Sequence, residues 1–119
     1  MSLQYFSINE FRCKCGCGMN RISMDFVTRL DCARKLAGVP FVITSGCRCP
    51  THNRAVGGSA YSSHMRGLAA DIRCRGDADR FHILNGLIRA GFTRIGVGSD
   101  FIHVDADTRK RDEIIWVYR

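Results

Sequence analysis

The chain has 119 residues, of which 45% are apolar and 24% are charged, a balance typical of one globular domain rather than a disordered or fibrous chain. No stretch approaches the roughly 20 apolar residues that cross a bilayer, so we expect no membrane-spanning helix. The first residues lack the basic and apolar regions of a secretory signal, so we expect no signal peptide. Lysine and arginine exceed aspartate and glutamate by 18 to 11, and the net charge of +7 favours an anionic partner, either a bacterial envelope or nucleic acid.

Residues 1–20 are rich in cysteine and glycine and predict a turn-rich N-terminal arm packed on the rest of the domain. Three of the seven cysteines, Cys13, Cys15 and Cys17, alternate with other residues, which is not the two-residue spacing of a zinc ribbon. Cys47 and Cys49 are also one residue apart. An odd number of cysteines cannot all pair within one chain, so we favour free thiols, with a second metal or disulfides as alternatives.

A helix is expected after the arm, capped by Ser23 and stopped by Gly38. Short strands are predicted over residues 41–44 and 68–72, and between them residues 45–63 form a long loop of the kind that is usually functional in a compact domain. The apolar positions at helical spacing in the first helix are Phe26, Val27, Leu30, Ala33 and Ala37.

The second half of the chain predicts one helix and three strands. Asp77 caps the helix and Gly91 ends it, and its periodicity places Phe81, Leu84, Leu87 and Ile88 inward. Two principal helices with a mainly antiparallel sheet make a single α+β domain over residues 1–119. Its last strands are expected at 93–97, 101–105 and 113–118, with Trp116 and Tyr118 packing on the sheet.

Three polar residues stand where a metal site could form. His64 lies in the long loop, Asp71 lies on the strand into which Gly67 turns the chain, and His103 lies between two β-branched residues of a central strand. Singly, each is more often a core histidine or an ion-pair aspartate. Together they match the two-nitrogen, one-oxygen set of catalytic zinc sites, which polarise a carbonyl and activate a water molecule. We therefore expect one catalytic zinc ion here.

The same segment resembles a known family signature. The pattern Ser-x-His-x-x-Gly-x-Ala-x-Asp, present from Ser62 to Asp71, is similar to that of the zinc D-alanyl-D-alanine carboxypeptidases, which share a fold with the Hedgehog domain. That family includes D-Ala-D-Ala dipeptidases and phage endolysins that cleave L-Ala–D-Glu bonds. Residues 43–53 resemble the family's Thr-Ser-Gly-Tyr-Arg segment, with Cys47 in place of the tyrosine, and residues 11–18 resemble the start of its compact phage and bacterial members.

The resemblance implies roles for residues besides the three metal ligands His64, Asp71 and His103. Asp100, three residues before the last histidine, would be the catalytic acid and base. Arg48 would bind a substrate carboxylate or the developing oxyanion, and Ser62 would line the substrate cleft.

Strand geometry leaves a rival to Asp100. On a regular strand His103 shares its face with Asp105, so Asp100 reaches the metal only if the chain turns at Ser99. Asp105 is therefore an alternative base, or else a partner that orients a ligand histidine. Family position favours Asp100.

The resulting prediction is a zinc-dependent peptidase acting on peptidoglycan stem peptides, either a D-Ala-D-Ala carboxypeptidase or an L-Ala-D-Glu-type endopeptidase. The alternative is a non-catalytic, zinc-containing peptidoglycan-binding module of the same fold. A nucleic-acid binder is disfavoured because the arginines are scattered from Arg12 to Arg119. We expect a monomeric bacterial or phage protein without membrane or nucleic-acid partners, made in the cytoplasm and released or exported to the cell wall.

Overall fold

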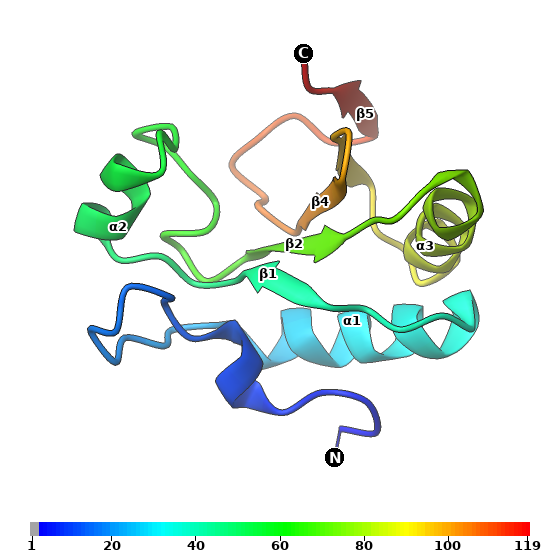
Figure 1. The fold of residues 1–119 in the computed structure, drawn as a ribbon, viewed down its shortest axis with the longest axis horizontal. Helices are drawn as coiled ribbons and strands as arrows, with labels where there is room; N and C mark the ends of the chain where they lie inside the picture. Colours follow the sequence, from blue (N-terminus) through cyan, green and yellow to red (C-terminus); the bar gives the residue numbers. More distant parts are fainter. Residues whose placement is uncertain (1–2) are drawn as a thin grey trace.

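The computed structural model describes residues 3–119 and contains a five-stranded sheet with helices on both sides (Figure 1). The strand order is β1-β2-β4-β3-β5, and all neighbours are antiparallel except β3 and β5, which are parallel. No helix within this range is long and apolar enough to span a membrane. The elements are η1 (Ile8–Phe11), α1 (Met24–Ala37), β1 (Ile43–Ser45), α2 (Pro50–Ala55), β2 (Ala69–Arg73), α3 (Asp77–Arg89), β3 (Arg94–Val97), β4 (Phe101–Asp105) and β5 (Ile114–Val117).

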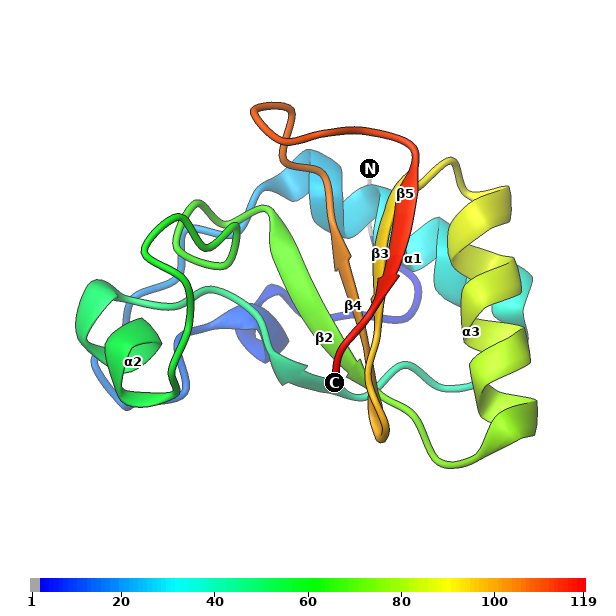
Figure 2. The same cartoon turned by 90° about the horizontal axis from the view of Figure 1, so that it is seen from above.

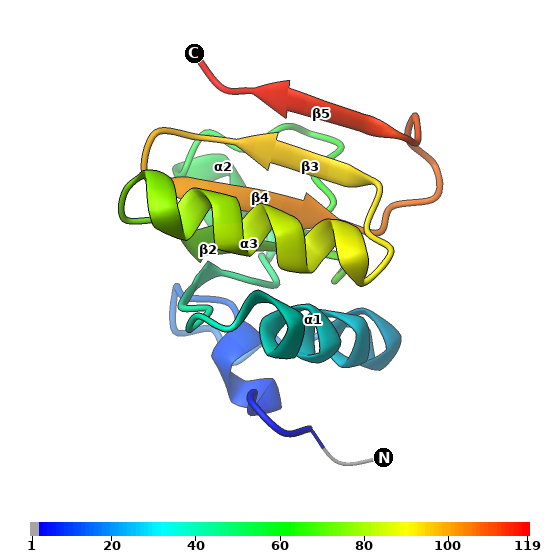
Figure 3. The ribbon, with the colours of Figure 1, turned by 90° about the vertical axis from the view of Figure 1, so that its right-hand side faces the viewer.

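The two long helices α1 and α3 cover one face of the sheet (Figure 3). The Ser23 hydroxyl accepts the Phe26 N–H at the start of α1, and Gly38 ends this helix in the left-handed conformation, as predicted. Helix α3 approaches α1 closely at Gly86, where a Cβ atom would lie 2.5 Å from the carbonyl oxygen of Ala33. The short helix α2 and the loop after it lie on the other side of the sheet (Figure 2).

Alternation along the strands separates an apolar face from a polar face. The apolar side chains join the helices and the aromatic residues of the arm in one buried core. The opposite face carries Asp71 on β2, His103 and Asp105 on β4, and Arg94 on β3. The strand residues in the core are Ile43, Ala70, Ile72, Ile95, Ile102 and Val104.

The α+β prediction is confirmed, and three local predictions were wrong. Residues 45–63 are not all loop, because Pro50 begins α2. Asp77 is the first residue of α3 and not its cap. The buried stripe of α3 contains Ile83, Gly86 and Leu87, while Phe81 and Ile88 are 65% and 52% exposed. The close contact between α3 and α1 requires a residue without a side chain, so α3 turns Gly86 toward α1. Hydropathy does not identify a glycine as an inward position.

Candidate metal centre

Two of the three predicted ligands are neighbours across the sheet. Asp71 on β2 pairs with His103 on β4, His103 pairs with Gly96 on β3, and Gly96 pairs with Trp116 on β5. Directly opposed side chains on one face lie close together, so this register alone brings Asp71 and His103 into contact. Gly96 leaves room for the Trp116 ring, whose centroid lies 5.5 Å from that of His103.

The third ligand, His64, comes from the turn before β2. Gly67 ends this turn with φ of +69°, and its carbonyl accepts the backbone N–H of Ser23, which joins the turn to the start of α1. Nδ1 of His64 lies 2.8 Å from the carbonyl oxygen of Gly46. Since a carbonyl only accepts hydrogen bonds, Nδ1 carries the proton, and in the neutral ring the lone pair of Nε2 faces the sheet.

The donor atoms of the three residues converge on one point. The Oδ1 atom of Asp71 lies 3.3 Å from Nε2 of His64 and 3.0 Å from Nδ1 of His103, and all three ligand atoms lie within 4.8 Å of one another. Because Nδ1 of His64 carries the proton of the neutral ring, the lone pair of its Nε2 can face the Asp71 oxygen favourably only across a cation, either an added proton or a metal ion. The residues therefore fit a zinc ion bound by two nitrogens and one oxygen.

The pKa shifts of these groups agree with such a site. Burial raises the pKa of Asp71, but its contacts with the rings of His103 and His64 outweigh this effect and hold that pKa well below its usual range. Burial lowers the pKa of His103, but Asp105 and Asp71 raise it above its ordinary value. The carboxylates of Asp71 and Asp105 favour a proton on His103, and a metal ion would have to displace that proton. Metal affinity should therefore fall at acidic pH.

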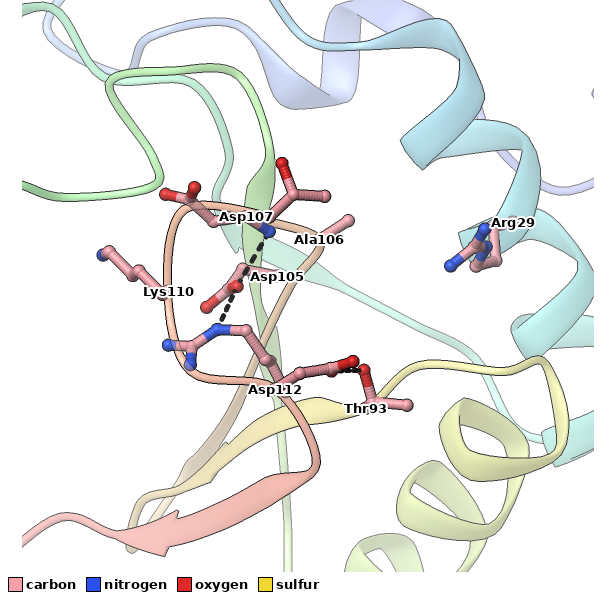
Figure 4. Close-up of a pocket in the computed structure, with 9 residues that line it drawn as sticks. Arg29, Thr93, Asp105, Ala106, Asp107, Lys110 and Asp112 are labelled. Atoms are coloured by element: carbon pink, nitrogen blue, oxygen red, sulfur yellow. Dashed lines mark hydrogen bonds and ion pairs between the residues drawn. The ribbon is translucent and has the colours of Figure 1, made fainter.

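Asp105 orients His103 from the side away from Asp71. Its Oδ2 atom accepts a hydrogen bond from Nε2 of His103 at 2.8 Å, which leaves Nδ1 as the atom directed at the metal position. Its Oδ1 atom accepts the Nε–H of Arg94 at 2.7 Å. The same atom accepts the backbone N–H of Asp107 at 3.1 Å (Figure 4). Both oxygens of this buried carboxylate are thus engaged, which favours the orienting role over that of a base.

Arg94 was not identified from the sequence, although it is one of the few buried charges of the protein. Its guanidinium carbon lies 5.1 Å from the centroid of the Trp116 ring, and a second nitrogen donates to the carbonyl of Arg111. The one indication in the sequence was an arginine at the start of an apolar strand. Its partner Asp105 became evident only from the pairing of β3 with β4.

Asp107 holds the His64 turn against the end of β4. Its side chain is buried and accepts the Ser63 hydroxyl at 2.8 Å, the backbone N–H of Arg109 at 3.1 Å and a hydrogen bond from Arg66. Burial raises the pKa of Asp107, but the Ser63 hydrogen bond, the Arg109 N–H and the charge of Arg66 together lower it below its usual range. Because Ser63 directly precedes His64, the Asp107 carboxylate helps to position His64.

We expect Asp107→Asn to destabilise the protein by about 2 kcal/mol at pH 7, because the amide cannot accept every hydrogen bond of the carboxylate. The folded-state pKa is lowered, so the contribution is complete above the unfolded pKa of about 3.9 and is lost as the pH falls through the folded pKa. Denaturant unfolding of wild type and variant at pH 7 and pH 3 should show the difference shrinking in acid. The exposed Asp77→Asn is the control, and a difference independent of pH would contradict the assignment.

The three candidate ligands line one cavity of about 310 Å³, which is also lined by Arg48, Ser62, Trp116 and Tyr118. Arg48 donates to Oγ of Ser45 at 3.0 Å and to Oδ1 of Asn53 at 3.3 Å, and its third nitrogen lies 3.4 Å from Oδ2 of Asp71. These contacts direct a guanidinium at the metal position.

Trp116 and Tyr118 line this cavity as well as contacting the sheet, whereas their sequence pattern predicted the sheet contacts alone. The reason is β5, which adds parallel to β3, carries Trp116 and leads directly into Tyr118, whose N–H donates to the Val97 carbonyl.

Asp100 lies at the tip of the β3–β4 hairpin, where the chain turns at Ser99 as the prediction requires. Its side chain is exposed and lines a shallow hollow with Thr44, Asp71, Arg73 and Phe101. Asp71 and Phe101 also line the main cavity, so the two spaces adjoin. Asp100 is therefore close to a ligand but is not one of the three converging groups.

The comparison with protein families agrees with this geometry. The sequence model of the Peptidase M15 family matches residues 4–105, a range that contains the three candidate ligands, Arg48 and Asp100. No curated protein sequence matches the chain. The match covers most of the 119 residues and ends at Asp105, the carboxylate that orients His103. The chain therefore belongs to the Peptidase M15 family, whose members are metal-dependent peptidases.

Proposed function

We propose that this protein is a zinc-dependent peptidase that hydrolyses peptide bonds in the stem peptides of bacterial peptidoglycan. The observation that carries the proposal is the convergence of Nε2 of His64, Oδ1 of Asp71 and Nδ1 of His103 at the wall of an open cavity. Three protein ligands beside solvent are typical of a catalytic rather than a structural zinc site. When bound, the ion would supply Lewis acidity toward the scissile carbonyl.

Arg48 supports a substrate with a carboxylate or a developing negative charge. Its guanidinium is held by Ser45, Asn53 and Asp71, so it is oriented before substrate arrives. A planar, oriented guanidinium stabilises charge that appears on an oxygen during peptide hydrolysis. Ser62, buried on the same wall, would contact the peptide. The net charge of +7 would attract the protein to an anionic wall.

Asp100 is the proposed acid and base. Asp105 is the rival, but both of its oxygens are engaged by His103, Arg94 and the backbone, and these contacts lower its pKa against the effect of burial. A base must take up a proton and release it, and a carboxylate held in this way does neither readily. Asp100 is exposed and lines the same hollow as Asp71. Within residues 3–119, its carboxylate accepts no hydrogen bond that would hold it in this way.

The test is incubation of the zinc-loaded protein with purified peptidoglycan, followed by mass analysis of the released fragments. We expect release of either D-alanine or soluble stem-peptide fragments, no release with a chelator, and recovery when zinc is restored. The mass of the fragments identifies the scissile bond, because a carboxypeptidase releases D-alanine and an endopeptidase releases longer peptides.

Chelator-insensitive release would contradict the zinc mechanism. Binding to peptidoglycan without any release would instead favour the non-catalytic module. A His64→Ala variant that should lack the metal is the matched control for release by a contaminating hydrolase.

A further inference from the structure

We propose that the protein binds a second zinc ion, through the thiolates of Cys13, Cys15, Cys17 and Cys49. The four sulfur atoms lie within 4.8 Å of one another, although Cys49 is 32 residues from Cys17 in sequence. Sγ of Cys15 lies 3.5 Å from that of Cys13 and 3.7 Å from that of Cys49. Four sulfurs at about 2.3 Å from a zinc ion form a tetrahedron with edges of about 3.8 Å, so these separations suit zinc.

The backbone of the arm is folded around this point. In an extended chain three alternate cysteines would be spread along one face, but Gly16, with φ of +89°, turns the chain between Cys15 and Cys17. The N–H of Cys13 donates to the carbonyl of Met19 at 2.8 Å and closes the turn. The turn therefore brings the three cysteines of the arm together instead of spreading them along one face.

Backbone N–H groups also donate to three of the four sulfurs. Cys49 N–H donates to Sγ of Cys13 at 3.3 Å, Met19 N–H to Sγ of Cys17 at 3.4 Å, and His52 N–H to Sγ of Cys49 at 3.3 Å. N–H groups that face a sulfur atom are placed to stabilise the negative charge of a metal-bound thiolate. Soft thiolate ligands in a tetrahedral arrangement select zinc among the common divalent ions.

The other three cysteines lie outside the group and have ordinary roles. Cys47 and Cys74 are buried, and burial raises the pKa of each thiol, while Cys32 is exposed on α1. A disulfide needs two sulfurs, whereas four converge here. A four-thiolate site accounts for this convergence and leaves three free thiols, in agreement with the odd total of seven.

This ion would be structural, because protein ligands fill all four positions and leave none for water. It would join the arm to the segment that carries Arg48, since Cys49 follows Arg48 and its sulfur caps α2. The arm already contacts this segment, where the N–H of Cys47 donates to the carbonyl of Phe11 at 2.7 Å. The second zinc would thus help to hold the cavity wall on which Arg48 lies.

The experiment measures metal content and thiol reactivity of the purified 119-residue protein from zinc-supplemented cells. We expect two zinc ions per chain in wild type and in Cys32→Ser, and one in Cys15→Ser and in His64→Ala. A disulfide reagent should react rapidly with Cys32 alone, and the four cluster thiols should react after chelation. Cobalt substitution of His64→Ala should give the strong ultraviolet charge-transfer absorption of thiolate ligands.

A wild-type zinc content of one that falls to zero in His64→Ala would overturn the proposal. So would a protein mass lower by two hydrogens for each disulfide among the cluster cysteines, or iron in place of zinc. Cys15→Ser is the chosen variant because Cys15 is exposed, so its replacement leaves the core intact. The second zinc is counted in His64→Ala, so the result does not depend on peptidase activity.

Discussion

An Asp100→Ala variant is expected to keep the zinc of the active site and to lose about 10²- to 10⁴-fold in kcat/KM, the usual contribution of a general acid and base. The variant should fold normally, because the Asp100 side chain is exposed and its backbone carbonyl still accepts the N–H of Cys74. The measurement is hydrolysis of a purified stem peptide together with zinc analysis. Ser99→Ala, in the same hairpin turn, is the matched control and should retain activity.

Asp105→Asn is expected to behave in the opposite way. It should weaken zinc binding by about 10- to 100-fold, because the amide is a poorer acceptor for the His103 N–H, while activity should recover in excess zinc. The asparagine keeps the volume of the buried side chain, so that packing around Arg94 is preserved. An active Asp100→Ala together with an Asp105→Asn that stays inactive at saturating zinc would reverse the two assignments.

The largest loss of stability is expected at Gly67. Its φ of +69° is disfavoured for alanine, and an added Cβ would lie 2.0 Å from the carbonyl oxygen of Arg21, a backbone atom that cannot move aside. The left-handed conformation costs about 1–2 kcal/mol and overpacking about 1–3 kcal/mol. We therefore expect Gly67→Ala to destabilise the protein by about 4 kcal/mol and to lower the Tm by about 10–15 °C.

Gly38→Ala separates the two causes. Gly38 has almost the same φ, +71°, but an added Cβ would meet no atom within 4 Å, so only the conformational cost of about 1 kcal/mol remains. Thermal unfolding of both variants at the same zinc concentration measures the difference. Equal destabilisation would show that the close approach of Gly67 to Arg21 does not exist in solution. Since Gly67 ends the turn that carries His64, its substitution should also lower zinc affinity.

Much of the fold follows from local sequence signals. Ser23 and Gly38 bound α1 because a hydroxyl cap and a left-handed glycine act within one turn of the helix. β4 extends over residues 101–105, as alternation predicted. The candidate metal-binding set His64, Asp71 and His103 could also be proposed from the sequence, because the residue types that bind zinc are few and residues 62–71 resemble a family signature.

Other features depend on contacts between distant segments. Asp105 is an orienting carboxylate because β3 brings Arg94 beside it, and Trp116 lines the cavity because Gly96 leaves space for its ring. The inward face of α3 depends on a glycine in contact with α1, which hydropathy does not register.

The metal centre illustrates the same division. The sequence by itself determined which donors a zinc ion would use, because coordination depends on residue type. Only the tertiary structure decided which nitrogen of each histidine would face a metal ion, through the Gly46 carbonyl and the Asp105 carboxylate. It also placed Cys49 against the three cysteines of the arm. Packing between distant segments creates this cluster, so no sequence spacing reveals it.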